Sequence, residues 1–236
     1  MRPVIPFAQP AVFVCVLAAI LCGPAGAAAQ TVPSPYEFIE TRHEVSVFGG
    51  TATDDRGTLR LGPGGGPMFG ARYAFDLTGV FAIETGFSYL MADREVYDPE
   101  VQAVEPELLG VADAHVGILD ARARLNVTGP RTWNRLAPFL FTGIGIAFDL
   151  SGETELDDGL DPTARFEFGP SFAGTFGGGV RWLAGDRFGV RLESTVHFWR
   201  IAHPLGFRTR QQDLQAVPAD EWSQSIAVTI GATYRF

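Results

Sequence analysis

Two titratable side chains that could act together as general base and general acid stand four residues apart in the sequence, Glu193 and His197. In a β-strand both would lie on one face, separated by ~13 Å at ~3.3 Å per residue. A catalytic pair needs direct hydrogen-bond contact, so this spacing argues against acid–base chemistry between them. We expect His197 to belong to a network of polar side chains instead.

Other site patterns are absent from the sequence. No set of Cys or His residues has the spacing of zinc ligands. The glycine-rich stretch at residues 62–67 is not followed by Lys-Ser or Lys-Thr, and no helical pattern begins there, so it does not predict a phosphate-binding loop. We interpret it as a flexible surface loop, and we expect neither a cofactor nor a metal site.

Acidic residues concentrate in two long stretches between apolar segments. Residues 91–111 contain six acids and one arginine, and residues 151–165 contain five acids and one arginine. Carboxylates are ligands for divalent cations, but the spacing does not match an EF-hand loop. The interpretation we favour is a solvated, mutually repulsive exterior that keeps these loops from associating.

The N-terminus has the organisation of an export signal. Arg2 precedes an apolar run at residues 11–22, and Ala27 to Ala29 provide a small-residue cleavage site. We place cleavage after Ala29, which defines residues 1–29 as a signal peptide and residues 30–41 as a short leader. Both cysteines leave with the signal, so disulfides cannot stabilise the mature chain. Losing Arg2 changes the net charge from −9 to −10, and this excludes general nucleic-acid binding.

Eight later segments alternate between apolar and polar residues with the period of a β-strand. In the last one, Ile226, Val228 and Ile230 face one side, while Ser225 and Thr229 face the other. The predicted strands cover residues 43–51, 68–77, 81–89, 119–127, 138–150, 166–182, 188–198 and 222–236. Short links alternate with long ones, which is the pattern of periplasmic turns and outer loops in a membrane barrel. Aromatic residues, Trp182, Trp199 and Trp222 among them, gather toward the strand ends and predict two interfacial girdles.

The C-terminal strand carries a more specific signal. Thr229, Gly231, Tyr234 and Phe236 fit the sequence read by the bacterial barrel-assembly machinery: a polar residue, a glycine, and apolar residues at the third-last and last positions. Together with the glycine-rich fifth and sixth strands, residues 42–236 resemble small eight-stranded outer-membrane barrels of the OmpA-like, opacity-protein type. The resemblance implies an all-β, antiparallel, up-and-down transmembrane barrel in the outer membrane of a Gram-negative bacterium. Its implied partners are outer-membrane lipid, lipopolysaccharide and the assembly machinery, and a monomer is expected.

The predicted inner faces of the strands carry charges of both signs in equal number. The acids are Glu44, Asp76, Glu84, Asp120, Glu167 and Glu193, and the bases are Arg72, Arg122, Arg124, Arg181, Arg191 and Arg235. A barrel of about eight strands is just wide enough for its own side chains to fill. Isolated charges there would be costly, so we expect a paired network that plugs the lumen.

These features predict a non-enzymatic, porin-like barrel with a structural or surface-interaction role. Two alternatives stay open: a lipid-modifying barrel enzyme, and a narrow channel or small-ligand carrier. A lipid A deacylase would need His and Ser two residues apart on one strand, and His197 is followed by Phe198 and Trp199.

Overall fold

The computed structural model describes residues 34–99, 107–209 and 218–236. The chain divides into two units, Met1–Ser34 and Pro35–Phe236, and the second contains all of the architecture described below. The predicted signal peptide, its cleavage site and the first residues of the predicted leader lie outside the described residues. No described helix is both long and apolar enough to cross a membrane.

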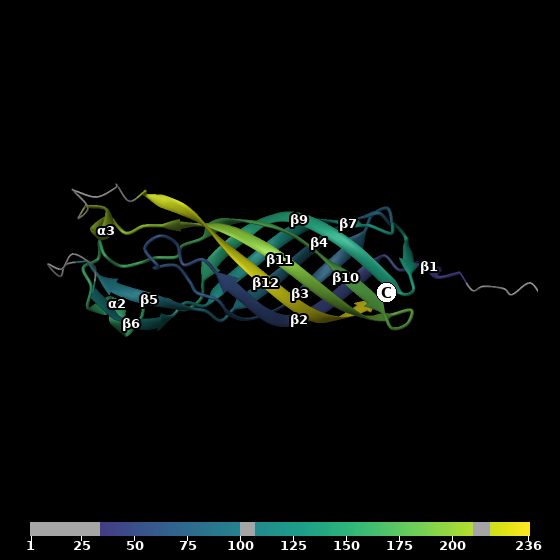
Figure 1. Cartoon of the computed structure of the whole chain (residues 1–236), viewed down its shortest axis with the longest axis horizontal. Helices are drawn as coiled ribbons and strands as arrows, with labels where there is room; N and C mark the ends of the chain where they lie inside the picture. Colours follow the sequence, from purple (N-terminus) through teal and green to yellow (C-terminus); the bar gives the residue numbers. More distant parts are fainter. Residues whose placement is uncertain (1–33, 100–106, 210–217) are drawn as a thin grey trace, which may run out of the picture. The chain divides into compact units, whose positions relative to one another are not determined.

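Eight antiparallel strands close into one barrel, as predicted (Figure 1). They occur in the order β2, β3, β4, β7, β9, β10, β11 and β12, and β12 pairs back onto β2 to complete the ring. Their bounds are β2 His43–Asp54, β3 Gly66–Asp76, β4 Phe81–Leu90, β7 Val116–Asn126, β9 Leu136–Asp149, β10 Ser171–Leu183, β11 Phe188–Ala202 and β12 Asp220–Arg235.

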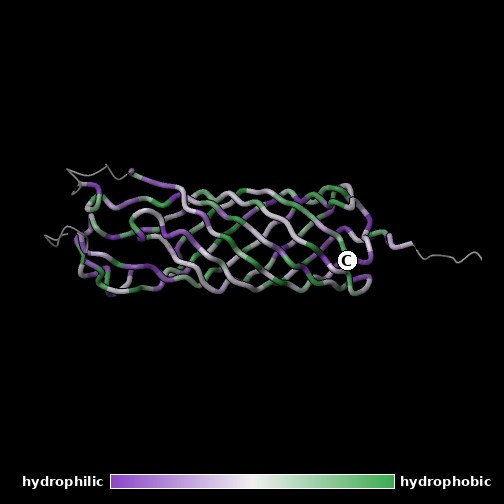
Figure 2. Tube along the Cα trace, in the orientation of Figure 1, coloured by the Kyte–Doolittle hydropathy of each residue, from purple (hydrophilic) through white to green (hydrophobic). Residues whose placement is uncertain are grey.

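Alternation of side chains decides which face of each strand meets lipid. Ile144 is 61% exposed, Ile230 60% and Val47 59%, although all three are apolar. Between them on the same strands, Glu44, Gly145 and Thr229 point inward. Apolar residues therefore recur along the outside of the barrel, and hydrophobic positions alternate with less hydrophobic ones along its strands (Figure 2). Such an outer band, with every strand edge paired, is what a sheet requires to cross a bilayer.

The sixth strand is shorter than predicted. We expected it to include Phe166 and Phe168 on the outer face, but β10 begins at Ser171 and both rings are buried. Pro170 precedes the strand and has no N–H to donate to a neighbour. The alternation before this proline therefore belongs to a loop whose aromatic side chains pack inward.

Connections at the two ends of the barrel differ in length, as predicted. At one end, the tight β3–β4 turn uses Gly79 at a φ of +73°, and the β7–β9 link contains β8 (Arg131–Trp133). β1 (Tyr36–Phe38), within the predicted leader, pairs with β8. At the other end are four long loops, L1 (residues 55–65), L2 (91–115), L3 (150–170) and L4 (203–219). L2 contains the hairpin β5 (Asp93–Asp98) and β6 (Glu107–Asp113), L3 contains α2 (Glu155–Asp158) and L4 contains α3 (Leu205–Thr209).

Candidate functional site: the barrel interior

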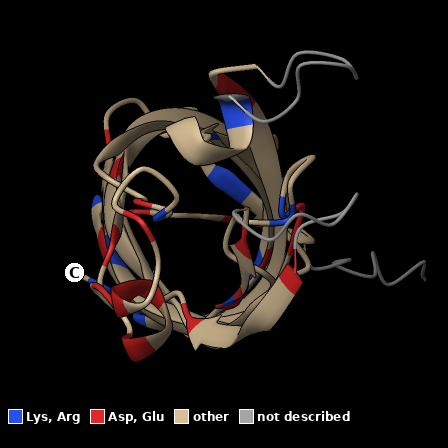
Figure 3. Ribbon diagram, turned by 90° about the vertical axis from the view of Figure 1, so that its left-hand side faces the viewer, with Lys and Arg blue, Asp and Glu red and all other residues tan. Residues whose placement is uncertain are grey.

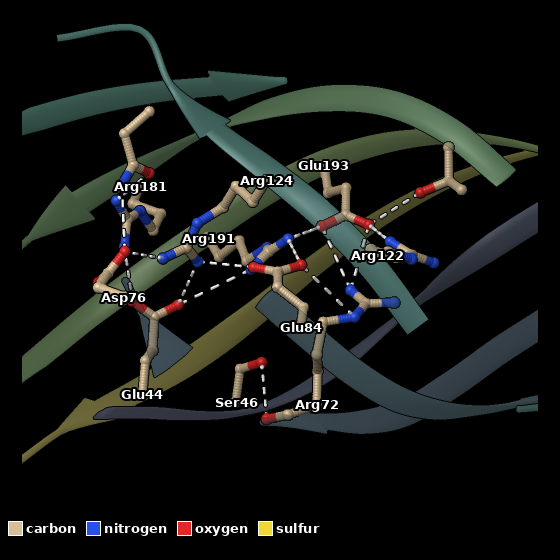
Figure 4. A network of polar contacts seen from close by, with 12 residues as sticks. Glu44, Ser46, Arg72, Asp76, Glu84, Arg122, Arg124, Arg181, Arg191 and Glu193 are labelled. Carbon is tan, nitrogen blue, oxygen red and sulfur yellow. Dashed lines mark hydrogen bonds and ion pairs between the residues drawn. The ribbon is translucent and has the colours of Figure 1, made fainter. Parts of the chain in front are cut away.

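Buried charges fill the half of the lumen nearest the short turns. Ten of the twelve side chains predicted for the lumen network form one connected set of ion pairs (Figure 4). The set balances five carboxylates against five guanidinium groups: Glu44, Asp76, Glu84, Asp120, Glu193, Arg72, Arg122, Arg124, Arg181 and Arg191. The members come from β2, β3, β4, β7, β10 and β11, so the network ties strands together across the lumen.

Glu84 lies at the centre of this network and is completely buried. Its Oε1 accepts hydrogen bonds from Arg124 Nη1 at 2.6 Å and Arg191 Nη1 at 2.7 Å, and its Oε2 accepts one from Arg191 Nη2 at 3.0 Å. Arg191 is therefore bidentate on Glu84, and it also contacts Glu193 at 2.5 Å. The planar fork of arginine suits such multiple contacts, which lysine could not reproduce.

Two inward phenylalanines of β9 support the network from one side. The guanidinium carbon of Arg191 lies 4.3 Å from the Phe139 ring centroid, and that of Arg122 lies 4.5 Å from the Phe141 ring. These cation–π contacts explain why the fifth predicted strand breaks the simple alternation of apolar outside and polar inside. Gly179 on the next strand makes room, since an added Cβ would lie 2.8 Å from the edge of the Phe139 ring.

Two predicted members of the network lie elsewhere. Placing Glu167 in the lumen was wrong: it is exposed in L3, because the strand that would have carried it begins only after Pro170. Arg235 is buried at the turn end of the barrel, but its Nη2 donates to the backbone oxygen of Gly185 at 2.8 Å. Among the described residues, no carboxylate lies within 4.0 Å of its guanidinium nitrogens.

The other half of the lumen is closed by apolar side chains, which the sequence analysis did not predict. Trp199, Ile201, Leu90 and Ile118 point inward from three strands, each at most 1% exposed. Leu61 of L1, Phe166 and Phe168 of L3 and Phe207 of L4 pack onto them. We call this cluster the apolar plug. Assigning Trp199 to an interfacial girdle was therefore wrong, because it shares the inward face of β11 with Glu193 and His197. The even spacing of these three residues in the sequence already indicates that they lie on one face.

The outer surface changes character at the level of the plug. Above Phe198 on β11 the outward positions are Arg200 and Ala202, and Arg200 forms an ion pair with Asp220 of β12. On β11 the residues below this level are mostly apolar outside and polar or charged inside, whereas at and above it Arg200 and Ala202 point outward and Trp199 and Ile201 point inward. We call this change the polarity inversion. It marks where the strands leave the hydrocarbon, because only water can solvate an exposed Arg–Asp pair at little cost.

The described parts of the four long loops lie at one end of the barrel, above the plug, and we call them the cap (Figure 3). Arg56 of L1 pairs with Asp93 and Glu95 of L2, each at 2.7 Å. Arg94 of L2 pairs with Asp157 of L3, and Gly206 N of L4 donates to Thr163 O of L3 at 2.8 Å. The expectation of loops kept apart by their charge was therefore wrong for the described residues. Arginines pair with the loop acids Asp93, Glu95, Glu153 and Asp157, and Gly62 to Gly64 are buried instead of forming a free loop.

Asp157 is the most buried acid of the cap, with 2% of the residue exposed. Burial alone would raise the pKa of its carboxyl group. Hydrogen bonds from the Arg94 side chain, from Thr154 Oγ1 at 2.6 Å and from Thr154 N at 3.0 Å outweigh burial and leave the pKa below its usual value. Asp157 is therefore ionised at neutral pH and joins L2 to L3.

His197 and Glu193 are the interior candidates for acid–base chemistry that the sequence offered. His197 and Glu193 are both buried on β11, and no hydrogen bond between them occurs in the described structure. The cross-strand partner of His197 is Ser225, which is 0% exposed, and His197 Nδ1 makes no hydrogen bond to it. Within the described ranges, no group of three or more His, Cys, Asp or Glu side chains could hold a metal ion.

The four residues of the predicted assembly signal lie on β12 and at its end. Thr229 and Gly231 face inward, whereas Tyr234 and Phe236 are 38% and 55% exposed on the outer surface. Phe236 stacks on the His43 ring with centroids 5.4 Å apart, and His43 Nδ1 lies 2.7 Å from Tyr73 Oη. These rings belong to the aromatic girdle at the turn end of the barrel.

Comparison with known proteins gives matches among solved structures only. No protein-family model matches the chain, and neither does any curated protein. Neisserial surface protein A has a TM-score of 0.50 and 11% identity, covering 82% of this chain and 97% of that one. OprG from Pseudomonas aeruginosa has a TM-score of 0.48 and 12% identity over 83% and 97% of the two chains. Ail of Yersinia pestis has a TM-score of 0.40 and 15% identity over 84% and 99%. The closed barrel, its apolar outer face and its likeness to Neisserial surface protein A show that this chain has the fold of small eight-stranded outer-membrane β-barrels.

Proposed function

We propose that this protein is a sealed, non-enzymatic barrel that holds an ordered cap at the cell surface, where the cap serves a structural or surface-interaction role. The observation that carries the proposal is the filled lumen. Five guanidinium groups and five carboxylates occupy its lower half, and the apolar plug occupies its upper half. An ion entering this path would have to displace paired charges and then cross an apolar layer, and each of these steps is costly.

Single-channel recording in planar bilayers tests the sealed lumen. We expect no steady conductance from the pure, folded wild-type protein, with an open porin as the positive control. A variant with Trp199→Ala and Glu84→Ala would shorten side chains in both layers, so we expect it to leak if the two layers are the seal. Regular conductance steps from the wild-type protein would contradict the proposal and favour a narrow channel.

A lipid-modifying enzyme is the alternative of another class. His197 and Ser225 would be its obvious pair, but they are at most 1% exposed and point into the lumen, away from lipid. We therefore expect no change in lipid A when the protein is incubated with lipopolysaccharide in mixed micelles. Modification that disappears in Ser225→Ala or His197→Asn would establish an enzyme.

The remaining expectations concern partners and biogenesis. We propose that the protein is a monomer in outer-membrane lipid and lipopolysaccharide, and that the assembly machinery reads Thr229, Gly231, Tyr234 and Phe236. The outward, exposed rings of Tyr234 and Phe236 support recognition from the lipid side. Deleting Phe236 should reduce insertion in cells while leaving refolding into detergent intact; equal loss in both would contradict a recognition role.

A further inference from the structure

A pocket of about 500 Å³ opens at the turn end of the barrel, which faces the periplasm if the short connections are periplasmic. One side is formed by the segment around β1, which is held by β1–β8 pairing and by Ile39 N donating to Pro130 O at 2.9 Å. The opposite side is formed by the β10–β11 turn and the end of β12. The polar residues in its lining are Glu37, Glu40, Thr41, Thr132, Arg135, Asp186 and Arg235.

Arg235 distinguishes this pocket from the rest of the interior. The five other inward arginines each have a carboxylate within 3.2 Å, whereas Arg235 has none within 4.0 Å among the described residues. The residue is only 4% exposed, and its Nε makes no hydrogen bond. Thr41 Oγ1, in the same lining, is also buried and without a partner.

A buried guanidinium with no carboxylate in direct contact is costly, and a carboxylate bound through two parallel N–H···O bonds removes most of that cost. Glu44, Asp76 and Asp186 attract Arg235 only from beyond 4.0 Å. The acids of the lining add a second condition. Glu37, Glu40 and Asp186 are all exposed, and among the described residues only Glu37 has a cation within 4.0 Å, Arg135 at 3.9 Å. They would repel a doubly charged anion but attract an ammonium group attached to the bound carboxylate.

We propose that this pocket binds the carboxylate of a small zwitterionic ligand, such as an amino acid or a short peptide, with Arg235 as the carboxylate ligand and the acidic lining as the ammonium ligand. The proposal does not depend on the sealed lumen above it, because the site lies at the mouth and the ligand need not cross the barrel.

Amide chemical shifts of the refolded, isotope-labelled full chain in detergent can test this, with glycylglycine as the probe. We expect saturable shifts centred on Gly185 and Thr41, with a dissociation constant on the order of 1 mM. Glycylglycine amide, which lacks the carboxylate, should give no saturable shifts, and acetate and inorganic phosphate should bind more weakly than glycylglycine. Absence of saturable shifts with glycylglycine, or shifts confined to other residues, would overturn the proposal.

Variants assign the binding to the side chain. Arg235→Gln should weaken glycylglycine binding by about tenfold or more, since the charge-assisted bonds are lost. Arg187→Gln is the matched control, because Arg187 is exposed on the adjacent turn and is not part of the lining. If Arg235→Gln does not refold, Arg235→Lys keeps the charge without the fork and should bind measurably more weakly. Unchanged affinity in a folded Arg235 variant would overturn the assignment, and so would equal binding of glycylglycine and its amide.

Discussion

Removing the charge of Glu84 tests most directly whether the buried ion pairs stabilise the barrel. In Glu84→Gln the side chain keeps its shape, but three short hydrogen bonds to Arg124 and Arg191 lose their charged acceptor. Hydrogen bonds to charged groups contribute about 1.5–3 kcal/mol each, and these three are not independent. Removing one partner of a buried ionic network costs about 3–5 kcal/mol, because the remaining charge stays buried. We expect a loss of that size in the free energy of unfolding.

The assay is reversible urea unfolding in lipid vesicles, followed by tryptophan fluorescence. The matched control is Glu153→Gln in L3, an acid whose side chain is 67% exposed and lies 3.6 Å from Arg165. Exposed pairs of this kind contribute about 0–1 kcal/mol, so the two glutamates should differ severalfold in effect.

A double-variant cycle separates pairing from simple loss of packing. Arg191→Met should also destabilise the barrel, but combining it with Glu84→Gln should cost clearly less than the two single losses added together. Additive losses would refute the idea that these two charges stabilise one another. A loss below about 1 kcal/mol in Glu84→Gln alone would refute the claim that the lumen is a tightly coupled ionic network.

Three further predictions concern other parts of the molecule. The protein refolded in detergent should migrate differently on gels before and after boiling and show β-rich circular dichroism; good solubility without detergent, and no shift, would contradict a membrane barrel. In single-tryptophan variants, brominated lipid should quench Trp182 strongly and Trp199 weakly, because Trp182 is 48% exposed on the outer face and Trp199 is 0% exposed in the plug; equal quenching would contradict the placement of Trp199 in the plug. Asp157→Asn should speed hydrogen exchange in β5 and β6 at pH 7. Because folding lowers the pKa of Asp157, the carboxylate stabilises the cap fully above its ordinary pKa of 3.8, and this stabilisation is lost as the pH falls through the pKa of the folded state. The exchange rates of the variant and the wild-type protein should therefore converge only at such acidic pH.

Alternation predicted the strands and which charged side chains share one face of each strand. A period of two fixes which side chains share a face, so Glu84, Arg124 and Arg191 could be assigned to one space before any coordinates were known. Alternation cannot tell which face is the inner one, and the terminal signal and the aromatic residues supplied that choice. Pairing partners could not be predicted, since they depend on the register between strands distant in the sequence.

The wrong predictions concern segments outside the hydrocarbon, where alternation no longer separates lipid-facing from lumen-facing residues. Phe166 and Phe168 follow the alternation but precede Pro170, where the strand cannot begin. Trp199 was judged by residue type, although its parity with Glu193 already placed it inside. Net charge predicted that the loops repel one another, because it describes only the average interaction. The contacts between the loops depend on a few arginines, such as Arg56 and Arg94.

The polarity inversion also limits how the barrel can respond to a bilayer of another thickness. Two residues along a strand correspond to ~6.6 Å, or about 5 Å along the membrane normal at a typical tilt. A displacement of that size toward the periplasm would bring Arg200, which is paired with Asp220, to the depth where Phe198 now meets lipid tails. The polarity inversion therefore fixes the depth of the barrel in the bilayer, and a bilayer that is too thick or too thin must deform to match it.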